Sequence, residues 1–291
     1  MLGAGVILFL AVLQGASELF PVSSLGHAVV APPLLHLGFR QSDPAFVPVL
    51  TMLHLGTAAA LVVLYRRDWW RIVTGFARAL WRADVRDEDG RLAIMLLIGT
   101  VPAAVIGFAF EASLKANFAD PRTAGALLVV NAGILLGAEA FRRRDERRQH
   151  IAASRARQHA PDDPAYARVE GLGLGTALLV GVCQVAALFP GISRSGVTMA
   201  AGLVAGLRHQ EAARFSFLLA TPIILGAGLL EVPDLGPDRP TALLAAGAAA
   251  VAGVIAYLSA RFLVRYLRFG RLDPFAYYCA ALGVATLIAL R

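Results

Sequence analysis

Two short stretches decide the fold of this chain: ELFPVSSLGH (18–27) and ALFPGISRSG (187–196). Each stretch interrupts an apolar region with a Phe-Pro pair, serines and a glycine. The apolar arms on either side are too short to cross a bilayer, since a crossing helix needs roughly 20 apolar residues. Backbone outside a helix is tolerated at membrane depth only where protein or a wet cavity surrounds it. We therefore expect two re-entrant helical hairpins, over 3–38 and 172–207.

Three long apolar stretches follow each hairpin. The expected spans are 46–65, 92–111, 122–141, 211–230, 241–260 and 273–290. Because three is odd, the second copy must enter the membrane from the opposite side, which gives an inverted-topology repeat with its site where the broken helices meet. The prediction is one all-α polytopic membrane domain over 1–291. Repeat one covers about 1–141, a loop about 142–170, and repeat two about 171–291.

The composition agrees with a membrane protein. The chain is 57% hydrophobic and 16% charged, whereas soluble domains carry about 25% charged residues. Most of the 27 basic residues fall in segments 66–91, 142–170, 208–214 and 261–271, which lie on one side in this topology. The positive-inside rule makes that side cytoplasmic and directs both termini outward. It also accounts for the net charge of +7 without nucleic acid binding.

All three tryptophans, Trp69, Trp70 and Trp81, lie within the first of these basic segments. One helical face would carry Trp70, Val73, Ala77, Leu80 and Trp81, and another would carry Arg71, Thr74, Arg78 and Arg82. This pattern predicts an interfacial amphipathic helix that anchors the protein, although a partner-binding role is an alternative. We expect the run FRRRDERRQH (141–150) to be a solvated loop.

Two charges lie deep in the predicted membrane region: Glu18 in the first break and Arg194 in the second. A charge near the bilayer centre costs at least ~2.5–3.5 kcal/mol, so such residues are candidates for function. A purely structural ion pair that joins the two repeats is the alternative. Gln14 lies four residues before Glu18, so both side chains can face one cavity.

The first break also supplies groups for proton transfer and nucleophilic attack. Pro21 ends the first arm, Ser23 or Ser24 can cap the next one, and His27 lies in its first turn. Capping alone would explain Ser23, and a histidine within the core would explain His27. The hydroxyl and imidazole groups nevertheless fit a nucleophile and its base.

The second break, PGISRSGVT (190–198), has the composition of an anion site. Its polar side chains at the start of a half-helix are Ser193, Arg194, Ser195 and Thr198. Free amides and the positive helix end favour an anion there, and the planar guanidinium of Arg194 suits phosphate oxygens. The two breaks together predict a phosphate site that also suits a substrate with a lipid tail.

At these residues the chain resembles the undecaprenyl-pyrophosphate phosphatases of the bacitracin-resistance type. The family is marked by (E/Q)xxxE followed by PxSSxGH, and by PGxSRSxxT. The first motif corresponds to Gln14 to His27 here and the second to Pro190 to Thr198. The resemblance implies hydrolysis of undecaprenyl pyrophosphate to undecaprenyl phosphate and phosphate in the bacterial inner membrane, which recycles the lipid carrier for cell-wall synthesis.

The resemblance also implies roles for individual residues. Glu18, Ser24, His27 and Arg194 are the catalytic candidates, and Ser23, Ser193, Arg194, Ser195 and Thr198 are the phosphate-binding candidates. Ser24 is the expected nucleophile, with His27 or Glu18 as its base, and His27 as nucleophile is the rival assignment. Members use Mg²⁺ or Ca²⁺, here held by Glu18 with Gln14 as a further ligand. Many members have Glu where this chain has Gln14. Because Gln removes one negative charge from the cation site, a single ion is more plausible than two.

Three matters stay open at the level of sequence. Inverted repeats with broken helices are also a transporter architecture, so a carrier of polyprenyl phosphate lipids is the alternative function. A homodimer is possible, and the sequence does not fix the face toward which the cavity opens.

Overall fold

The computed structural model describes residues 3–39, 43, 45–82, 87–110, 120–156, 172–231 and 239–291. Within these ranges the chain is helical and contains no β-strand. Before residue 120 the helices are α1 (Ala4–Ser17), α2 (Ser24–Leu34), α3 (Phe46–Leu64), α4 (Arg66–Arg82) and α5 (Glu88–Ala109). The later helices are α7 (Pro121–Ala156), α8 (Leu174–Val185), the 3₁₀ turn η2 (Ala186–Leu188), α9 (Arg194–Val204), α10 (His209–Glu231), α11 (Arg239–Tyr266) and α12 (Asp273–Ala289).

Among the residues that the structure describes, four helices are long and apolar enough to cross a membrane: α3, α5, the 121–148 part of α7, and the 243–266 part of α11. They match four of the six expected spans. The other two expected spans form α10, of 23 residues, and α12, of 17 residues, with nearly the predicted bounds. The chain is therefore a multi-pass membrane protein.

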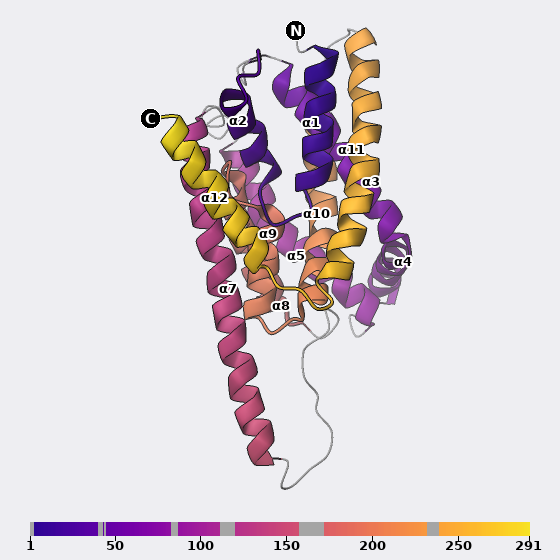
Figure 1. Ribbon diagram of the computed structural model, residues 1–291. Coiled ribbons are helices and arrows are strands. Elements are labelled where there is room, and N and C mark those ends of the chain that lie inside the picture. The colour runs from indigo at the N-terminus through magenta and orange to yellow at the C-terminus, as the bar shows by residue number, and fades with distance from the viewer. Residues whose placement is uncertain are drawn as a thin grey trace.

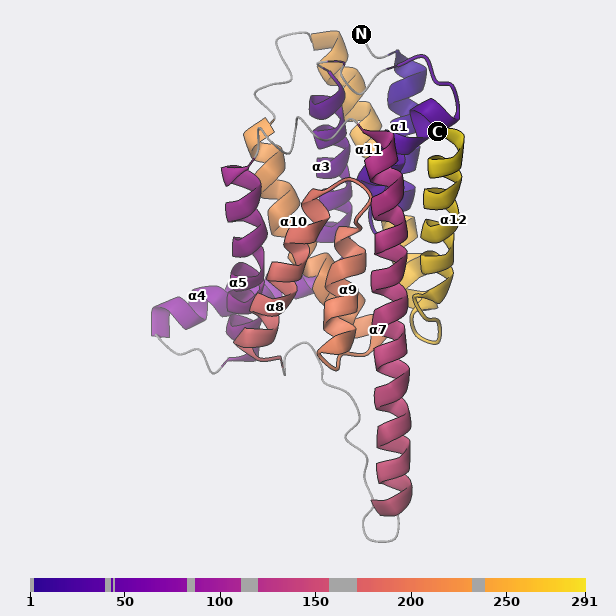
Figure 2. The ribbon, with the colours of Figure 1, turned by 90° about the vertical axis from the view of Figure 1, so that its left-hand side faces the viewer.

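Both expected breaks are present. The first separates α1 from α2, and the second separates α8 from α9; these four helices have only 11 to 14 residues each. Figures 1 and 2 show both breaks near the middle of the bundle, between the longer helices. A helix of 14 residues is about 21 Å long, which is shorter than the ~30 Å hydrocarbon core.

Glycines allow the helices around the first break to approach closely. A Cβ on Gly15 of α1 would lie 2.5 Å from the Ala252 carbonyl oxygen of α11, and a Cβ on Gly56 of α3 would lie 2.0 Å from the Ala249 carbonyl oxygen. On the other side of the molecule, α5 meets α8 in the same way, through Gly99 and Gly181. Small residues of this kind let membrane helices pack backbone to backbone.

The structure corrects one boundary. We expected a loop from residue 142, but α7 continues without interruption to Ala156 and projects beyond the bundle (Figure 2). Arg, Glu, Gln and Ala are good helix formers, and Arg142 and Glu146 form an i,i+4 pair with 3.4 Å between Nε and Oε1. Both factors extend the helix into the polar segment. Residues 157–170, the rest of the expected loop, lie outside the described residues.

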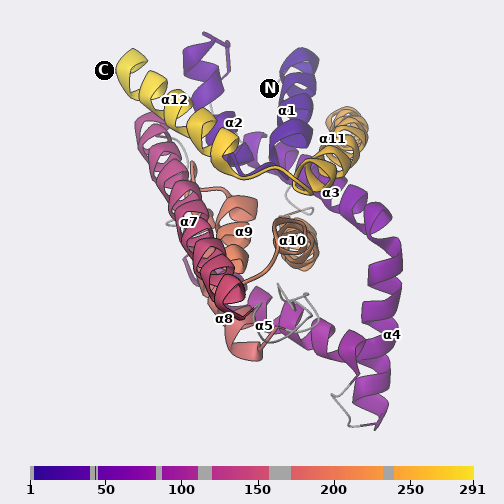
Figure 3. The same ribbon diagram turned by 60° about the horizontal axis from the view of Figure 1, so that its bottom comes forward.

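The basic helical extension and the chain termini lie at opposite ends of the bundle. In Figure 1 the beginning of α1 and the end of α12 are at the upper end, whereas α7 extends from the lower one. Helix α4 also lies toward the lower end and runs across the direction of the bundle (Figures 2 and 3). This arrangement agrees with the predicted separation of termini and basic segments.

Candidate active site

The two breaks share one helix-capping motif. Each ends in a Ser-x-x-Gly sequence at a helix start, and the serine hydroxyl accepts the backbone N–H of the glycine three residues later. The distance is 3.1 Å from Ser23 Oγ to the nitrogen of Gly26, and 3.0 Å from Ser193 Oγ to that of Gly196. Both serines are thus N-caps. Ser24 and Arg194 consequently occupy the first position of α2 and of α9.

The Glu18 carboxylate brings these two helix starts together. Its Oε1 accepts a hydrogen bond from Arg194, and its Oε2 accepts one from the hydroxyl of Ser24. Gln14 Nε2 donates to Oε2 over 2.9 Å. The ion pair between Glu18 and Arg194, which the sequence left as the alternative interpretation, is therefore present, but a serine hydroxyl shares the same carboxylate. A structural ion pair alone would not require that third group.

The position of Glu18 needs these partners. It is the C-cap of α1 and is 8% exposed, so an anion sits at the helix end where the macrodipole disfavours it. Hydrogen bonds from cationic and neutral donors offset that cost and the cost of burial. Arg194 is also fixed on its other side, where Nη1 donates to the Ala220 carbonyl of α10 over 3.1 Å.

The two breaks are also joined directly. Ser23 Oγ accepts the N–H of Gly191 over 3.2 Å, and Ser195 Oγ donates to the Phe20 carbonyl over 2.9 Å. The backbones approach so closely that a Cβ on Gly26 would lie 2.9 Å from the Cα of Gly191. The hydroxyls of Ser23 and Ser195, which we expected to bind phosphate, thus hold the breaks together.

The backbone is strained at this junction. Ser23 has φ of +67° and Gly191 has φ of +104°. Positive φ is ordinary for glycine but costs a serine about 1–2 kcal/mol. Such strain persists only where the surroundings over-determine it, and here the two hydrogen bonds to Ser23 Oγ do so. The strained turn directly precedes Ser24 and presents its hydroxyl to Glu18.

The remaining phosphate-binding candidates have partners within the protein. Ser193 Oγ lies 3.0 Å from Ser195 Oγ. Thr198 Oγ1 lies 2.8 Å from the Arg194 carbonyl oxygen and 2.6 Å from Ser216 Oγ of α10. Thr198 therefore connects α9 to α10. Arg194 and Ser24 also have partners, and both of them bind the Glu18 carboxylate.

His27 lies apart from the Ser24–Glu18 contact. Its Nδ1 is 2.6 Å from the Ser23 carbonyl oxygen, and its Nε2 is 2.7 Å from the Tyr278 hydroxyl of α12. The two rings are parallel, with centroids 5.5 Å apart and an interplanar angle of 5°. Both ring nitrogens therefore have partners other than Ser24.

Three residues that the sequence analysis did not select contribute to the site. Tyr278 is one. His54 of α3 is another, with Nε2 3.4 Å from Oε2 of Glu18 and Nδ1 2.8 Å from the Leu50 carbonyl oxygen. The third is Asn131 of α7, whose side chain is fully buried. Its Nδ2 donates to the Pro21 carbonyl over 3.1 Å, and its Oδ1 accepts the N–H of Ser193 over 3.0 Å.

A polar side chain within an apolar span was the signal available for His54 and Asn131, since such residues are rare in membranes and face the interior. The prediction from sequence uses this criterion for charged side chains alone. Tyr278 carried no comparable signal, because tyrosine is common in membrane helices and Tyr277 precedes it.

The oxygen donors suit a divalent cation only in part. Gln14 Oε1 is buried without a hydrogen-bond partner, and it adjoins the Glu18 carboxylate through the amide of the same side chain. Amide and carboxylate oxygens are ligands that Mg²⁺ and Ca²⁺ accept. Among the described residues, no group of three or more His, Cys, Asp or Glu side chains could hold a metal. An ion here would need most of its ligands from substrate and water.

Both breaks lie within the part of the chain that matches a known protein family. The family described as bacitracin resistance protein BacA matches residues 7–285. The chain belongs to the BacA family. It is 45% identical to a protein of Granulibacter bethesdensis, covering 96% of this chain and 94% of that protein. It is 41% identical to a protein of Acidiphilium cryptum (98% and 97%) and 42% identical to one of Mycobacterium avium (95% and 94%). All three relatives are named undecaprenyl-diphosphatase.

Proposed function

We propose that this chain hydrolyses undecaprenyl diphosphate to undecaprenyl phosphate and phosphate. The observation that carries the proposal is the Glu18 carboxylate, which accepts hydrogen bonds from both Ser24 and Arg194 at the starts of two helices. A serine activated by a carboxylate beside a fixed guanidinium is an arrangement for phosphoryl transfer. BacA family membership and the names of the relatives support the same activity.

The terminal phosphate of the substrate would bind between Arg194 and the first amides of α2 and α9. The helix N-termini and the guanidinium favour an anion. Arg194 already uses Nη1 and Nη2 for Ala220 and Glu18. A phosphate that draws the guanidinium away from Glu18 leaves that carboxylate with fewer donors and so makes it a better proton acceptor.

Ser24 is the nucleophile in this proposal, and Glu18 is its base. The Ser24 oxygen attacks the terminal phosphorus as its proton passes to Glu18, and undecaprenyl phosphate leaves with the electron pair of the cleaved P–O bond. Glu18 passes this proton to the departing undecaprenyl phosphate. Water then attacks phosphoserine and gives a proton to Glu18, which returns one to the Ser24 oxygen as the bond between Ser24 and phosphorus breaks and phosphate is released. Arg194 and the helix amides stabilise the charge on the transferring group throughout.

His27 as nucleophile is the rival assignment. A trapped phosphoenzyme distinguishes the two, because phosphohistidine is acid-labile and alkali-stable whereas phosphoserine has the opposite stability. The present contacts of His27 favour Ser24, since Nε2 faces Tyr278 and Nδ1 faces Ser23. An acid-labile adduct that is lost in His27→Ala would exclude the serine mechanism.

We expect one divalent cation, Mg²⁺ or Ca²⁺, to assist. Glu18 and the unpaired Oε1 of Gln14 are the residues that would hold it. When bound, such an ion neutralises charge on the diphosphate. Phosphate release measured with Mg²⁺, with Ca²⁺ and with EDTA tests the expectation, and equal rates in all three would refute it.

The fold proposed for this activity is the inverted-topology repeat with two re-entrant hairpins. Repeat one is α1 to α7 and repeat two is α8 to α12, within one membrane domain. We place the protein in the bacterial inner membrane with its termini outside and its arginine-rich segments, including the end of α7, in the cytoplasm. Cysteine accessibility at residue 3 and at residue 147 in intact cells tests this placement. Labelling of a cysteine at residue 147 in preference to one at residue 3 would reverse the proposed orientation in the membrane.

A transporter of polyprenyl phosphate lipids remains the second candidate function, since broken helices and a buried anion site also serve transport. The contact between Ser24 and Glu18 favours the enzyme, because binding alone does not require a hydroxyl held against a carboxylate. The separating experiment is phosphate release from a polyprenyl diphosphate by the purified protein. If Ser24→Ala abolishes release but retains lipid binding, the protein is the phosphatase. Binding without release by the unmodified protein would favour transport.

A further inference from the structure

The buried imidazole of His27 has a defined hydrogen-bonding pattern. The Ser23 carbonyl can only accept a hydrogen bond, so Nδ1 of His27 must carry a proton in order to bind it at 2.6 Å. In the neutral ring, Nε2 is then an acceptor, and the Tyr278 hydroxyl, 2.7 Å away, is its donor. The phenol of α12 therefore selects the tautomer that donates to Ser23.

The carbonyl that His27 binds belongs to the strained residue of the site. Ser23 has φ of +67°, and its C=O belongs to the peptide group that carries the N–H of Ser24. The same carbonyl accepts the backbone N–H of His27 over 3.1 Å. A second hydrogen bond from the side chain fixes the plane of this peptide group. The orientation of the Ser24 side chain toward Glu18 depends on that plane.

Tyr278 is placed to hold the imidazole from outside. Its ring is parallel to that of His27, and Cys279, the next residue of α12, is fully buried against the first break, 3.8 Å from the Pro21 carbonyl oxygen. Tyr277 points elsewhere and is 62% exposed. Of two adjacent phenols on one helix, only Tyr278 contacts the site.

We propose that Tyr278 and His27 are positioning residues that brace the Ser23–Ser24 turn, rather than a proton-transfer pair acting on the substrate. The chain of contacts runs from the Tyr278 hydroxyl to His27, then to the Ser23 carbonyl, and so to the orientation of the nucleophile. This inference rests on the proposed phosphatase activity and assigns His27 a role different from nucleophile or base.

The proposal is tested by a substitution that keeps the hydrogen-bond donor facing Ser23 and removes the acceptor facing Tyr278. The amide of His27→Asn places an N–H donor near the position of Nδ1 and retains the hydrogen bond to Ser23, whereas His27→Ala removes both the donor and the acceptor. We expect His27→Asn to keep kcat within about tenfold of the unmodified enzyme, and His27→Ala to lower it at least a hundredfold. KM for the polyprenyl diphosphate should change less than threefold in both variants. Equal loss in the two variants would overturn the proposal, because proton transfer requires the imidazole itself.

The tyrosine pair supplies the matched control. Tyr278→Phe should lower kcat about three- to tenfold, whereas Tyr277→Phe should leave it unchanged. In the His27→Asn background, Tyr278→Phe should have no further effect, because the acceptor Nε2 is already gone. Independent, multiplicative effects would contradict the proposed chain of contacts. If the unmodified protein and Tyr277→Phe both fail to release phosphate, the phosphatase activity itself is refuted. That result is distinct from failure of the positioning role alone, in which the unmodified protein stays active.

Discussion

The Ser24 hydroxyl and the Glu18 carboxylate are hydrogen-bonded to each other although they belong to different sides of the first break. Glu18 ends α1 and Ser24 begins α2. The five residues between them, 19–23, bring a helix C-terminus and a helix N-terminus to one point. The carboxylate lies at the end that the helix dipole disfavours, and the hydroxyl lies at the end that attracts anions. The break thus places a proton acceptor and an anion site next to each other.

The Glu18→Gln variant tests the carboxylate as base. Removing the charge while keeping the shape should lower kcat by 10²–10⁴-fold, the usual contribution of a positioned acid or base. Phosphate release by the purified protein measures the effect. Glu88→Gln, at the exposed start of α5, is the control and should retain full activity. A kcat within threefold of the unmodified enzyme for Glu18→Gln would remove Glu18 from the proton transfer.

The contact between Gly26 and Gly191 predicts a second result. Alanine at position 26 would bring a Cβ within 2.9 Å of the Gly191 backbone, which cannot move aside as a flexible side chain does. Overpacking of this kind costs about 1–3 kcal/mol, and the two breaks should separate enough to reduce activity. The midpoint of thermal unfolding in detergent and the rate of phosphate release report the two effects.

Gly137→Ala is the matched control for Gly26→Ala. Gly137 lies in α7 with no atom within 4 Å of the position of a Cβ, so alanine there should stabilise the helix by roughly 0.5–1 kcal/mol. Equal stability and activity for the two alanine variants would show that the close approach of the breaks is not required.

Helix positions and the two breaks followed from the sequence because both depend on local properties. Runs of apolar residues give the long helices, and Phe-Pro with serine and glycine ends one helix and caps the next. The sequence also identified Glu18 and Arg194 as the two deep charges. Their direct pairing was the alternative interpretation, since two buried charges of opposite sign have few other partners in an apolar protein.

The remaining contacts of the site could not be predicted, because they depend on which helix faces which. Nothing in the sequence near Tyr278 indicates that it meets His27, 251 residues earlier. Likewise, the hydroxyls of Ser23 and Ser195 suit phosphate by type, and only the arrangement of the breaks shows that they bind Gly191 and Phe20. The helix over 142–156 differs from the predicted loop for another reason, because a densely charged segment can continue a helix into water as readily as it can form a loop.

Replacing Asn131 tests how the breaks are held together. Its amide binds the Pro21 carbonyl of one break and the Ser193 N–H of the other. Asn131→Leu keeps the approximate volume but leaves both backbone groups buried and unpaired, at a cost of ~1–3 kcal/mol for each group. We expect a lower midpoint of thermal unfolding and weaker binding of a polyprenyl diphosphate. Thr57→Val, which removes a buried hydroxyl that donates to His54 O within its own helix, is the control and should have the smaller effect. The reverse order would show that Asn131 does not join the breaks.

His54→Gln examines the fourth contact of the Glu18 carboxylate. Nε2 of the imidazole lies 3.4 Å from Oε2. Without this contact Glu18 is oriented less well, so kcat/KM should fall about tenfold. Steady-state phosphate release measures the change. His36→Gln, the same substitution at an exposed histidine, should have no effect. Equal rates for the two variants would mean that His54 takes no part in holding Glu18.

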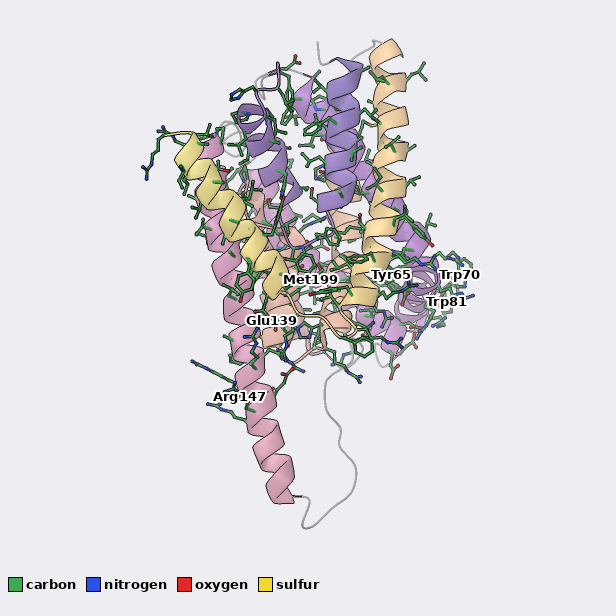
Figure 4. All side chains as sticks on the ribbon, in the orientation of Figure 1. Tyr65, Trp70, Trp81, Glu139, Arg147 and Met199 are labelled. Atoms are coloured by element: carbon green, nitrogen blue, oxygen red, sulfur yellow. The ribbon has the colours of Figure 1, made fainter. Side chains whose placement is uncertain are left out.

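Helix α4 provides the last prediction, which concerns the membrane. Its exposed side carries Trp70, Val73, Leu80 and Trp81, with exposed fractions of 73%, 59%, 68% and 92%, and Figure 4 shows Trp70 and Trp81 at the outer edge of the molecule. The helix runs across the bundle direction (Figure 3). A helix with tryptophans and arginines on different faces, lying in this orientation, binds at the lipid interface.

Tryptophan fluorescence isolates this helix, because all three tryptophans of the chain belong to it. In vesicles containing lipids brominated along the acyl chain, the emission of Trp70 and Trp81 should be quenched most strongly when the bromine lies near the headgroup. Trp69, which packs against the core, should be quenched less and serves as the internal control in the Trp70→Phe/Trp81→Phe double variant. Strong quenching by aqueous iodide together with none by brominated lipid would place the exposed face of α4 in water and exclude an interfacial helix.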